Sequence, residues 1–266
     1  MTSRRAVSSI VLLMLAFLLV GCFDIEQSIV LNKDLSGKAG FRMGIDFEPM
    51  VLIMLQMQRS MEGKKGAPTA DEIAKAKKDF LDQQKKEGDK PEVDRKAIEA
   101  GLPPGITLID QTMKQDGMKV LTNVVFGFSD PSKLALINMP KKEGEQPNDK
   151  SVINKPFDGL EIKDEGKTIL ITGKPANPVT GVGEGVKKAG GGEDNKEMEA
   201  MVKDAMKGLR VAVRIEAPFK VVESNATRKD GNALLWEYTL DSFEKMQKEG
   251  AKDIQVRVRY RKGRGS

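Results

Sequence analysis

The sequence contains no histidine, and it has one cysteine in 266 residues. The absence of histidine excludes the usual zinc and copper sites and the Ser-His-Asp and Cys-His nucleophile systems. A single cysteine leaves no partner for a disulfide within the chain, so the fold must be stabilised by packing. Acidic residues are plentiful, but no pair of them sits in a motif that fixes a catalytic geometry. We therefore expect a protein that is not an enzyme and that uses no metal and no cofactor.

The sequence also lacks a large excess of either sign of charge, because 44 basic residues are balanced by 39 acidic ones and the two kinds are interleaved. The formal net charge of +5 is mildly basic and does not indicate a nucleic-acid partner. Long apolar runs are equally few. After the N-terminal run that ends at Val20, no segment is long and apolar enough to span a membrane.

The N-terminal run has the layout of a secretory signal peptide. Arg4 and Arg5 precede an apolar stretch from Ala6 to Val20, and a small residue then precedes Cys22. The motif Leu19-Val20-Gly21-Cys22 resembles the lipobox of bacterial lipoproteins, which implies that residues 1–21 are removed and that a lipid is added to the Cys22 thiol. A membrane-spanning anchor is the alternative, but 15 residues are fewer than the ~20 that a spanning helix needs. We expect an exported protein of the cell envelope, anchored to a membrane by this lipid.

Alternation of apolar and polar residues predicts strands in most of the remaining chain. The clearest strand is 38–47, and turn residues join strands into four hairpins: 24–33 with 38–47, 106–114 with 118–128, 157–163 with 167–172, and 219–226 with 233–240. Further strands are expected at 209–216 and 253–261. Helical patterns cover 50–61, 71–87, 91–101, 131–137, 196–209 and 242–248.

These elements predict an α+β fold with a curved, mainly antiparallel sheet of about eight strands packed on helices. We expect one domain over residues 22–266, because the strand pairs at its two ends lack cores of their own. Residues 62–101 read as a charged helical excursion from the sheet, and residues 173–195 as a Gly-rich loop.

The helix predicted at 50–61 carries four methionines at helical spacing, which are Met50, Met54, Met57 and Met61. Core packing is one interpretation, because methionine fills irregular gaps well. A second is an adaptable wall of an apolar ligand site, or a surface patch for lipid or a partner. Binding of copper(I) by thioethers is a third. Met54 and Met57, with Phe41 on the preceding strand, are the candidate ligand-binding residues.

The last strand is basic on one face. Arg257, Arg259 and Arg261 are expected to point outward, while the residues between them point inward. One interpretation is a charged edge strand that resists aggregation. The other is contact with anionic lipid headgroups, for which Arg257 and Arg259 are the candidates.

Several turn and corner motifs together resemble the LppM-type domain found in bacterial lipoproteins and membrane-anchored envelope proteins. They are Cys22 with the hairpin around Gly37, the corner Phe128-Ser129-Asp130-Pro131, and the run from Pro218 to Trp236 with Asn225, Gly231 and Asn232. The resemblance covers about half of the chain after the signal peptide. Phe219 stands where the pattern has glycine, and the chain ends in basic residues where relatives often have a transmembrane helix. The resemblance implies the fold, an envelope location and a role in binding lipids or amphiphiles.

Two functions are therefore expected. The first is an envelope lipoprotein that binds a lipid or other amphiphile, and the second is a structural or assembly lipoprotein that docks another envelope protein through residues 62–101. An enclosed apolar cavity lined by Met54, Met57 and Phe41 would favour the first function. A solid core with an exposed apolar patch would favour the second.

Overall fold

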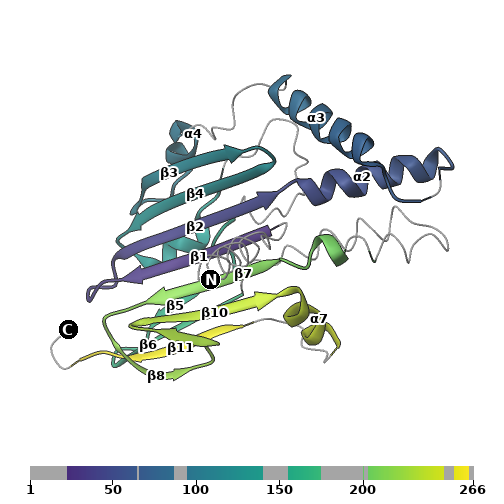
Figure 1. Cartoon of the computed structure of the whole chain (residues 1–266). Coiled ribbons are helices and arrows are strands. Elements are labelled where there is room, and N and C mark those ends of the chain that lie inside the picture. The colour runs from purple at the N-terminus through teal and green to yellow at the C-terminus, as the bar shows by residue number, and fades with distance from the viewer. Residues whose placement is uncertain are drawn as a thin grey trace, which may run out of the picture.

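The computed structural model describes residues 23–64, 66–86, 95–139, 155–174, 200, 203–248 and 255–263. They form an α+β fold in which two β-sheets carry several helices (Figure 1). This confirms the predicted fold class. The predicted signal peptide 1–21, Cys22, and all but the first two residues of the predicted Gly-rich loop 173–195 lie outside the described residues.

The larger sheet has seven strands in the order β3-β4-β2-β1-β7-β10-β9. Neighbouring strands in this sheet are antiparallel, except for β1 and β7, which are parallel. The bounds are β1 Phe23–Leu31, β2 Gly37–Asp46, β3 Ile106–Asp116, β4 Lys119–Phe128, β7 Arg210–Glu216, β9 Arg228–Asp230 and β10 Ala233–Thr239.

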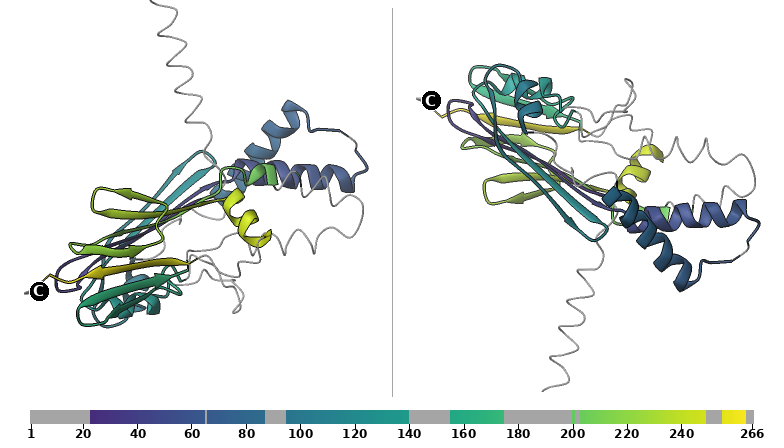
Figure 2. Two further views of the ribbon diagram at one scale, coloured as in Figure 1. Left: turned by 90° about the horizontal axis from the view of Figure 1, so that it is seen from below. Right: turned by 90° about the horizontal axis from the view of Figure 1, so that it is seen from above.

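The smaller sheet has four antiparallel strands in the order β5-β6-β11-β8, and it stacks on one face of the larger sheet (Figure 2). Its strands are β5 Glu161–Asp164, β6 Thr168–Gly173, β8 Lys220–Ser224 and β11 Val256–Arg261. Residues at alternate positions on both sheets fill the space between them. The largest fully buried side chains include Trp236, Tyr260, Phe41, Phe126 and Phe157.

The alternation of β2 shows why this layering follows from the sequence. Ala39, Phe41 and Met43 point into the core, whereas the residues between them face outward. At the start of β2, a Cβ atom on Gly37 would lie 2.0 Å from the Val30 carbonyl oxygen, so only glycine fits there. The first three predicted hairpins form as expected.

Two predictions about strand pairing were wrong. The strand predicted at 219–226 does not pair with 233–240, because β8 crosses to the smaller sheet and pairs with β11. The short β9 takes its place beside β10. The basic strand β11 is also not an edge strand, since it lies between β6 and β8. The eleven strands are therefore divided between two sheets rather than joined in one sheet of about eight.

The helices lie in different places. Two of them, α2 (Glu48–Met61) and α3 (Ala70–Lys86), form a hairpin that projects beyond one end of the sheets (Figures 1 and 2). Nearer the core are α4 (Arg95–Ala100) beside β3, the 3-10 helix η1 (Pro131–Leu136), and α7 (Leu240–Lys248), which continues from β10. Of the interpretations of the methionine-bearing helix, packing in the core of the sheets is not what the structure shows, because none of the described side chains of α2 and α3 belongs to the core cluster that the two sheets share.

Candidate functional site

The helical hairpin begins at the end of the sheet where β1 begins. Phe23, the first residue of β1, pairs with Ile45 near the end of β2, and α2 begins only three residues later at Glu48. The carboxylate of Asp46 accepts a hydrogen bond from the Glu48 backbone N–H at 3.0 Å, which fixes the start of the helix. The β3–β4 turn lies at the same end, because the Phe47 N–H donates to the Met118 carbonyl at 3.0 Å. We call this end of the molecule the β1 end.

Two ion pairs and a ring contact hold α3 against α2. The rings of Phe47 and Phe80 lie 5.5 Å apart, and Lys77 Nζ lies 2.5 Å from Glu48 Oε1. At the far end of the hairpin, Arg59 Nη1 lies 2.5 Å from Glu72 Oε1. These contacts fix one side of α2 against α3, and among the described residues no other helix packs on its opposite side.

Glu72 has a second role at the start of α3. Its carboxylate accepts a hydrogen bond from the Thr69 N–H at 2.8 Å, and the Thr69 hydroxyl in turn accepts from the Glu72 N–H at 3.3 Å. This reciprocal pair is a capping box. The bond from the Thr69 backbone is the main reason that the pKa of Glu72 lies below its ordinary value, with smaller contributions from the Thr69 hydroxyl and Arg59. The capping box therefore fixes the position at which α3 begins.

The free side of α2 is apolar. Met50 and Met54, one helical turn apart, are 41% and 57% exposed, and Met57 is half-buried. Val51, by contrast, is buried at the base of the helix. A helix with apolar residues on nearly every side is typical of a protein interior, so its position on a projecting hairpin leaves an apolar surface in contact with solvent. We call Met50, Met54 and Met57 the methionine face.

The structure does not bring the predicted ligand-binding residues together. Phe41 is 1% exposed within the core of the two sheets, whereas Met54 lies on the projecting hairpin. The enclosed cavity between Phe41, Met54 and Met57 that would favour the first function is therefore not formed by these residues. The reason is that the chain continues from the end of β2 into α2 and away from the sheet, instead of turning back over it (Figure 1).

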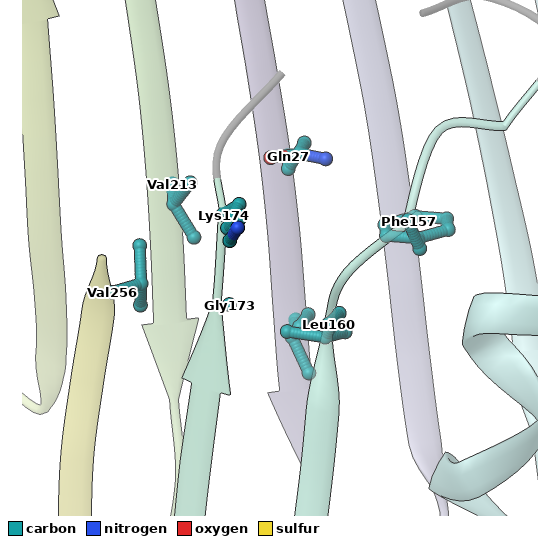
Figure 3. Close-up of a pocket in the computed structure, with 8 residues that line it drawn as sticks. Gln27, Phe157, Leu160, Gly173, Lys174, Val213 and Val256 are labelled. Atoms are coloured by element: carbon teal, nitrogen blue, oxygen red, sulfur yellow. The ribbon is translucent and has the colours of Figure 1, made fainter. Parts of the chain in front are cut away.

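A cavity does exist between the two sheets, but it is small. Its volume is about 10 Å³, room for one water molecule. Figure 3 shows the residues around it, which come from both sheets: Gln27, Ile29, Phe157, Leu160, Gly173, Lys174, Val213 and Val256. The Gln27 amide, which is buried, donates a hydrogen bond to the Pro156 carbonyl. A cavity of this size cannot hold a lipid chain.

The two candidate arginines lie on β11 and face away from the core, as predicted. Each has an acidic neighbour, because Arg259 Nη1 lies 2.6 Å from Glu165 Oε2 and Arg257 Nε lies 3.9 Å from Glu223 Oε1. The strand ends at Arg261, which pairs with Lys220 just after the end of β7 that is remote from Phe23. The basic end of the chain and the methionine face are thus at opposite ends of the molecule (Figure 2).

Sequence reasoning missed two polar clusters. On the outer face of the larger sheet, Arg210 donates to Asp24 at 2.8 Å and to Glu237 at 2.6 Å, and it lies 3.4 Å from Glu26. Partial burial lowers the pKa of Arg210, but these carboxylates raise it by more, so the net shift is upward. The parallel pairing of β1 with β7 creates this cluster, and no local pattern in the sequence announces that pairing.

The second cluster joins the two sheets. Asn225 Oδ1 accepts hydrogen bonds from the Trp236 indole N–H at 2.7 Å and from the Arg257 backbone N–H at 2.8 Å. Its amide donates to the Gln255 carbonyl at 2.8 Å. In the sequence, Asn225 and Trp236 contribute only to a family resemblance. In the structure, their hydrogen bonds connect the two sheets.

Within the described residues, no helix has the length and apolar character needed to cross a bilayer. In the same part of the chain, no three acidic, histidine or cysteine residues are grouped as a metal site would require.

Comparison with known proteins gives little. No protein family model matches the chain. No curated protein matches it either. Among solved structures, the chain is similar to the folded domain of LppM from Mycobacterium tuberculosis, determined by NMR, with a TM-score of 0.43 and 10% sequence identity over 91% of this chain and 90% of that one. This likeness is distant, and it assigns neither a family nor an activity.

Proposed function

We propose that this protein is an exported lipoprotein of the bacterial cell envelope that binds lipid through the methionine face and performs no catalysis. The proposal rests on one observation. The helix that exposes Met50 and Met54 begins three residues after the strand position that pairs with Phe23, and Phe23 directly follows the lipobox cysteine Cys22. The apolar surface and the expected lipid anchor are therefore close neighbours.

The mode of binding follows from where apolar surface is available. The cavity between the sheets holds about 10 Å³, which is too small for an acyl chain. The methionine face is open and flexible, and methionine side chains adapt to irregular apolar ligands. Lipid would thus be bound at the surface of α2 rather than in an enclosed pocket.

The first experiment tests the anchor. In a bacterial host that processes lipoproteins, Cys22→Ala should leave the precursor uncleaved and abolish incorporation of labelled fatty acid. Cys22 supplies the only thiol in the chain, so unchanged labelling of this variant would reject the lipoprotein assignment outright.

The second experiment tests lipid binding. A fluorescent fatty acid is titrated into residues 23–266, comparing the wild type with Met54→Gln and with Val30→Gln as a control of similar exposure on β1. Loss of one apolar contact worth ~1–1.5 kcal/mol should weaken binding about tenfold for Met54→Gln and leave the control unchanged. No binding by the wild type would reject amphiphile binding for the ligands tried.

A second candidate function is supported by the same exposed face. An exposed apolar patch without an enclosed cavity beside it is the arrangement expected for docking of another envelope protein, and what favours lipid instead is the closeness of the patch to Cys22. In that case the fatty acid would not bind, while Met54→Gln would reduce cross-linking of the anchored protein to a neighbour in intact cells.

A further inference from the structure

We infer that the methionine face rests in the surface of the same bilayer that holds the anchor, so that α2 forms a second membrane contact and fixes the orientation of the domain. This inference depends on the proposed lipidation of Cys22. It goes further by naming the ligand as the assembled lipid surface, not a single lipid taken from solution.

Covalent geometry supplies the first step. Consecutive Cα atoms are ~3.8 Å apart, so an anchor on Cys22 holds Phe23 within a few ångströms of the membrane surface. Phe23 pairs with Ile45, and Glu48 follows after two intervening residues. Since a helix rises ~1.5 Å per residue, Met54 lies only ~9 Å along α2 from Glu48. The methionine face is therefore within reach of the bilayer whenever the anchor is inserted.

The distribution of charge supplies the second step. Two ion pairs of the hairpin lie between α2 and α3, namely Glu48 with Lys77 and Arg59 with Glu72. A third, between Glu62 and Lys64, lies at the tip of the hairpin. Met50 and Met54 lie on the opposite, exposed side of α2. This separation gives the hairpin one apolar and one polar side, as in helices that lie in the plane of a membrane interface. Because the contact is apolar, we expect it to depend little on salt.

The opposite end of the molecule supplies the third step. Val30 lies seven residues beyond Phe23 on β1, which is roughly 23 Å along an extended strand. The basic strand β11 also ends on that side, at Arg261 (Figure 2). With α2 on the bilayer, this end points away from the anchoring membrane. The arginines of β11 then do not contact the headgroups of that membrane.

The test uses the mature lipidated protein reconstituted in vesicles of phosphatidylethanolamine and phosphatidylglycerol. A lipidated Cys22 has no free thiol, and it is the only cysteine, so Met54→Cys and Val30→Cys each introduce one reactive thiol for an environment-sensitive fluorophore. The two positions are matched controls, because both side chains are exposed and apolar, at opposite ends of the molecule. Quenching is measured with aqueous iodide and with spin-labelled lipids.

We expect the fluorophore at Met54 to be quenched by the spin-labelled lipids and to show iodide quenching at least threefold weaker than at Val30. The reason is that an interfacial helix buries its apolar face ~5–10 Å into the headgroup and acyl boundary, beyond the reach of an aqueous ion. Raising the salt concentration should leave the quenching of the Met54 label by the spin-labelled lipids unchanged, because the contact is apolar.

Four outcomes would count against the inference. Equal iodide quenching at both positions would mean that α2 stays in water. Shielding of Met54 from iodide without quenching by the spin-labelled lipids would mean that protein covers the face, from this chain, a second copy or another partner. If the label at Met54 responds to added fatty acid but not to the bilayer, the proposed function stands and this inference falls. If mass spectrometry finds two labels per chain, Cys22 carries no lipid and the proposed function falls first.

Discussion

The bonds around Asn225 give the sharpest quantitative prediction, because one exposed side chain joins the two sheets. Its carbonyl oxygen accepts from Trp236 on β10 and from the backbone of Arg257 on β11, and its amide donates to the Gln255 carbonyl. Its own backbone N–H donates to the Arg257 carbonyl at 3.1 Å, and this bond survives truncation of the side chain. Asn225→Ala therefore removes three side-chain bonds without disturbing the backbone register.

The expected loss can be worked out bond by bond. Trp236 is 0% exposed, and leaving its indole N–H without an acceptor should cost ~1–3 kcal/mol. The bonds from the Arg257 N–H and to the Gln255 carbonyl lie at the surface, where water replaces the lost partner, so each should contribute no more than ~0.5 kcal/mol. We expect Asn225→Ala to lower the free energy of unfolding by ~1–4 kcal/mol. For a chain of this size, that corresponds to a fall in Tm of about 2–15 °C.

The assay is urea and thermal unfolding of the wild type, Asn225→Ala, Trp236→Phe and the double variant. In the double variant the unpaired donor is absent, so the two changes should be non-additive by ~1–2 kcal/mol. Asn138→Ala serves as the control, since that exposed side chain makes only a 3.5 Å contact with Leu136 and should change stability by less than ~0.5 kcal/mol. Additive effects at Asn225 and Trp236 would refute the reasoning that their hydrogen bond couples the sheets.

Four further predictions concern other parts of the fold. Burial raises the pKa of Tyr238 to about 12 and that of Tyr260 further, so the stability they contribute is complete below the unfolded pKa of ~10 and is lost as pH rises above it. Phenolate absorbance will report both, because the chain has two tyrosines. The Tyr260 hydroxyl is buried with no partner among the described residues, so Tyr260→Phe should raise stability by up to ~1 kcal/mol in urea unfolding. Phe80→Ala should detach α3 from α2 and increase proteolysis in the hairpin, with the urea midpoint of the sheets unchanged, because neither helix belongs to the shared core. Arg210→Gln should lower stability by ~1 kcal/mol at low salt, since Glu26 and Glu237 lose their cation and Asp24 keeps only the more distant Arg42 at 3.8 Å, and added salt should reduce that deficit in the same assay.

The alternation of apolar and polar residues correctly predicted strands that have one buried and one exposed face. The strict alternation of 38–47 predicted both the strand β2 and its buried face, which includes Phe41. The same reasoning predicted that Val256, Val258 and Tyr260 face the core while Arg257 points outward. These elements have one apolar and one polar face, so side-chain burial alone fixes which way each strand lies.

Strand partners could not be predicted in the same way, because they depend on residues far apart in the chain. The pairing of β1 with β7 joins segments separated by some 180 residues, and the position of β8 in the smaller sheet depends on the chain crossing over after β7. Neither of these two pairings produces a periodic pattern of residues in the sequence. The Arg210 cluster and the Asn225 bridge are products of these long-range pairings, which is why their residues could not be assigned roles beforehand.

The methionine helix shows a different limit. Its apolar composition indicated burial, and core packing was the simplest interpretation of four methionines at helical spacing. The structure instead exposes Met50 and Met54 on a hairpin outside the core. Periodicity reports that a face is apolar, but it does not report what that face contacts.

What the face contacts is better argued from position than from composition. A free apolar patch on a soluble domain would be an aggregation hazard, and monomeric proteins rarely keep one without a use. Here the helix that carries the patch begins near the first residue of β1, and the residue before that is Cys22, for which we propose lipidation. A lipid anchor at that cysteine would present α2 to a bilayer before it met any soluble partner. Under this proposal, the exposed methionines are part of the attachment to the membrane, and the two sheets with their basic strand are held beyond it.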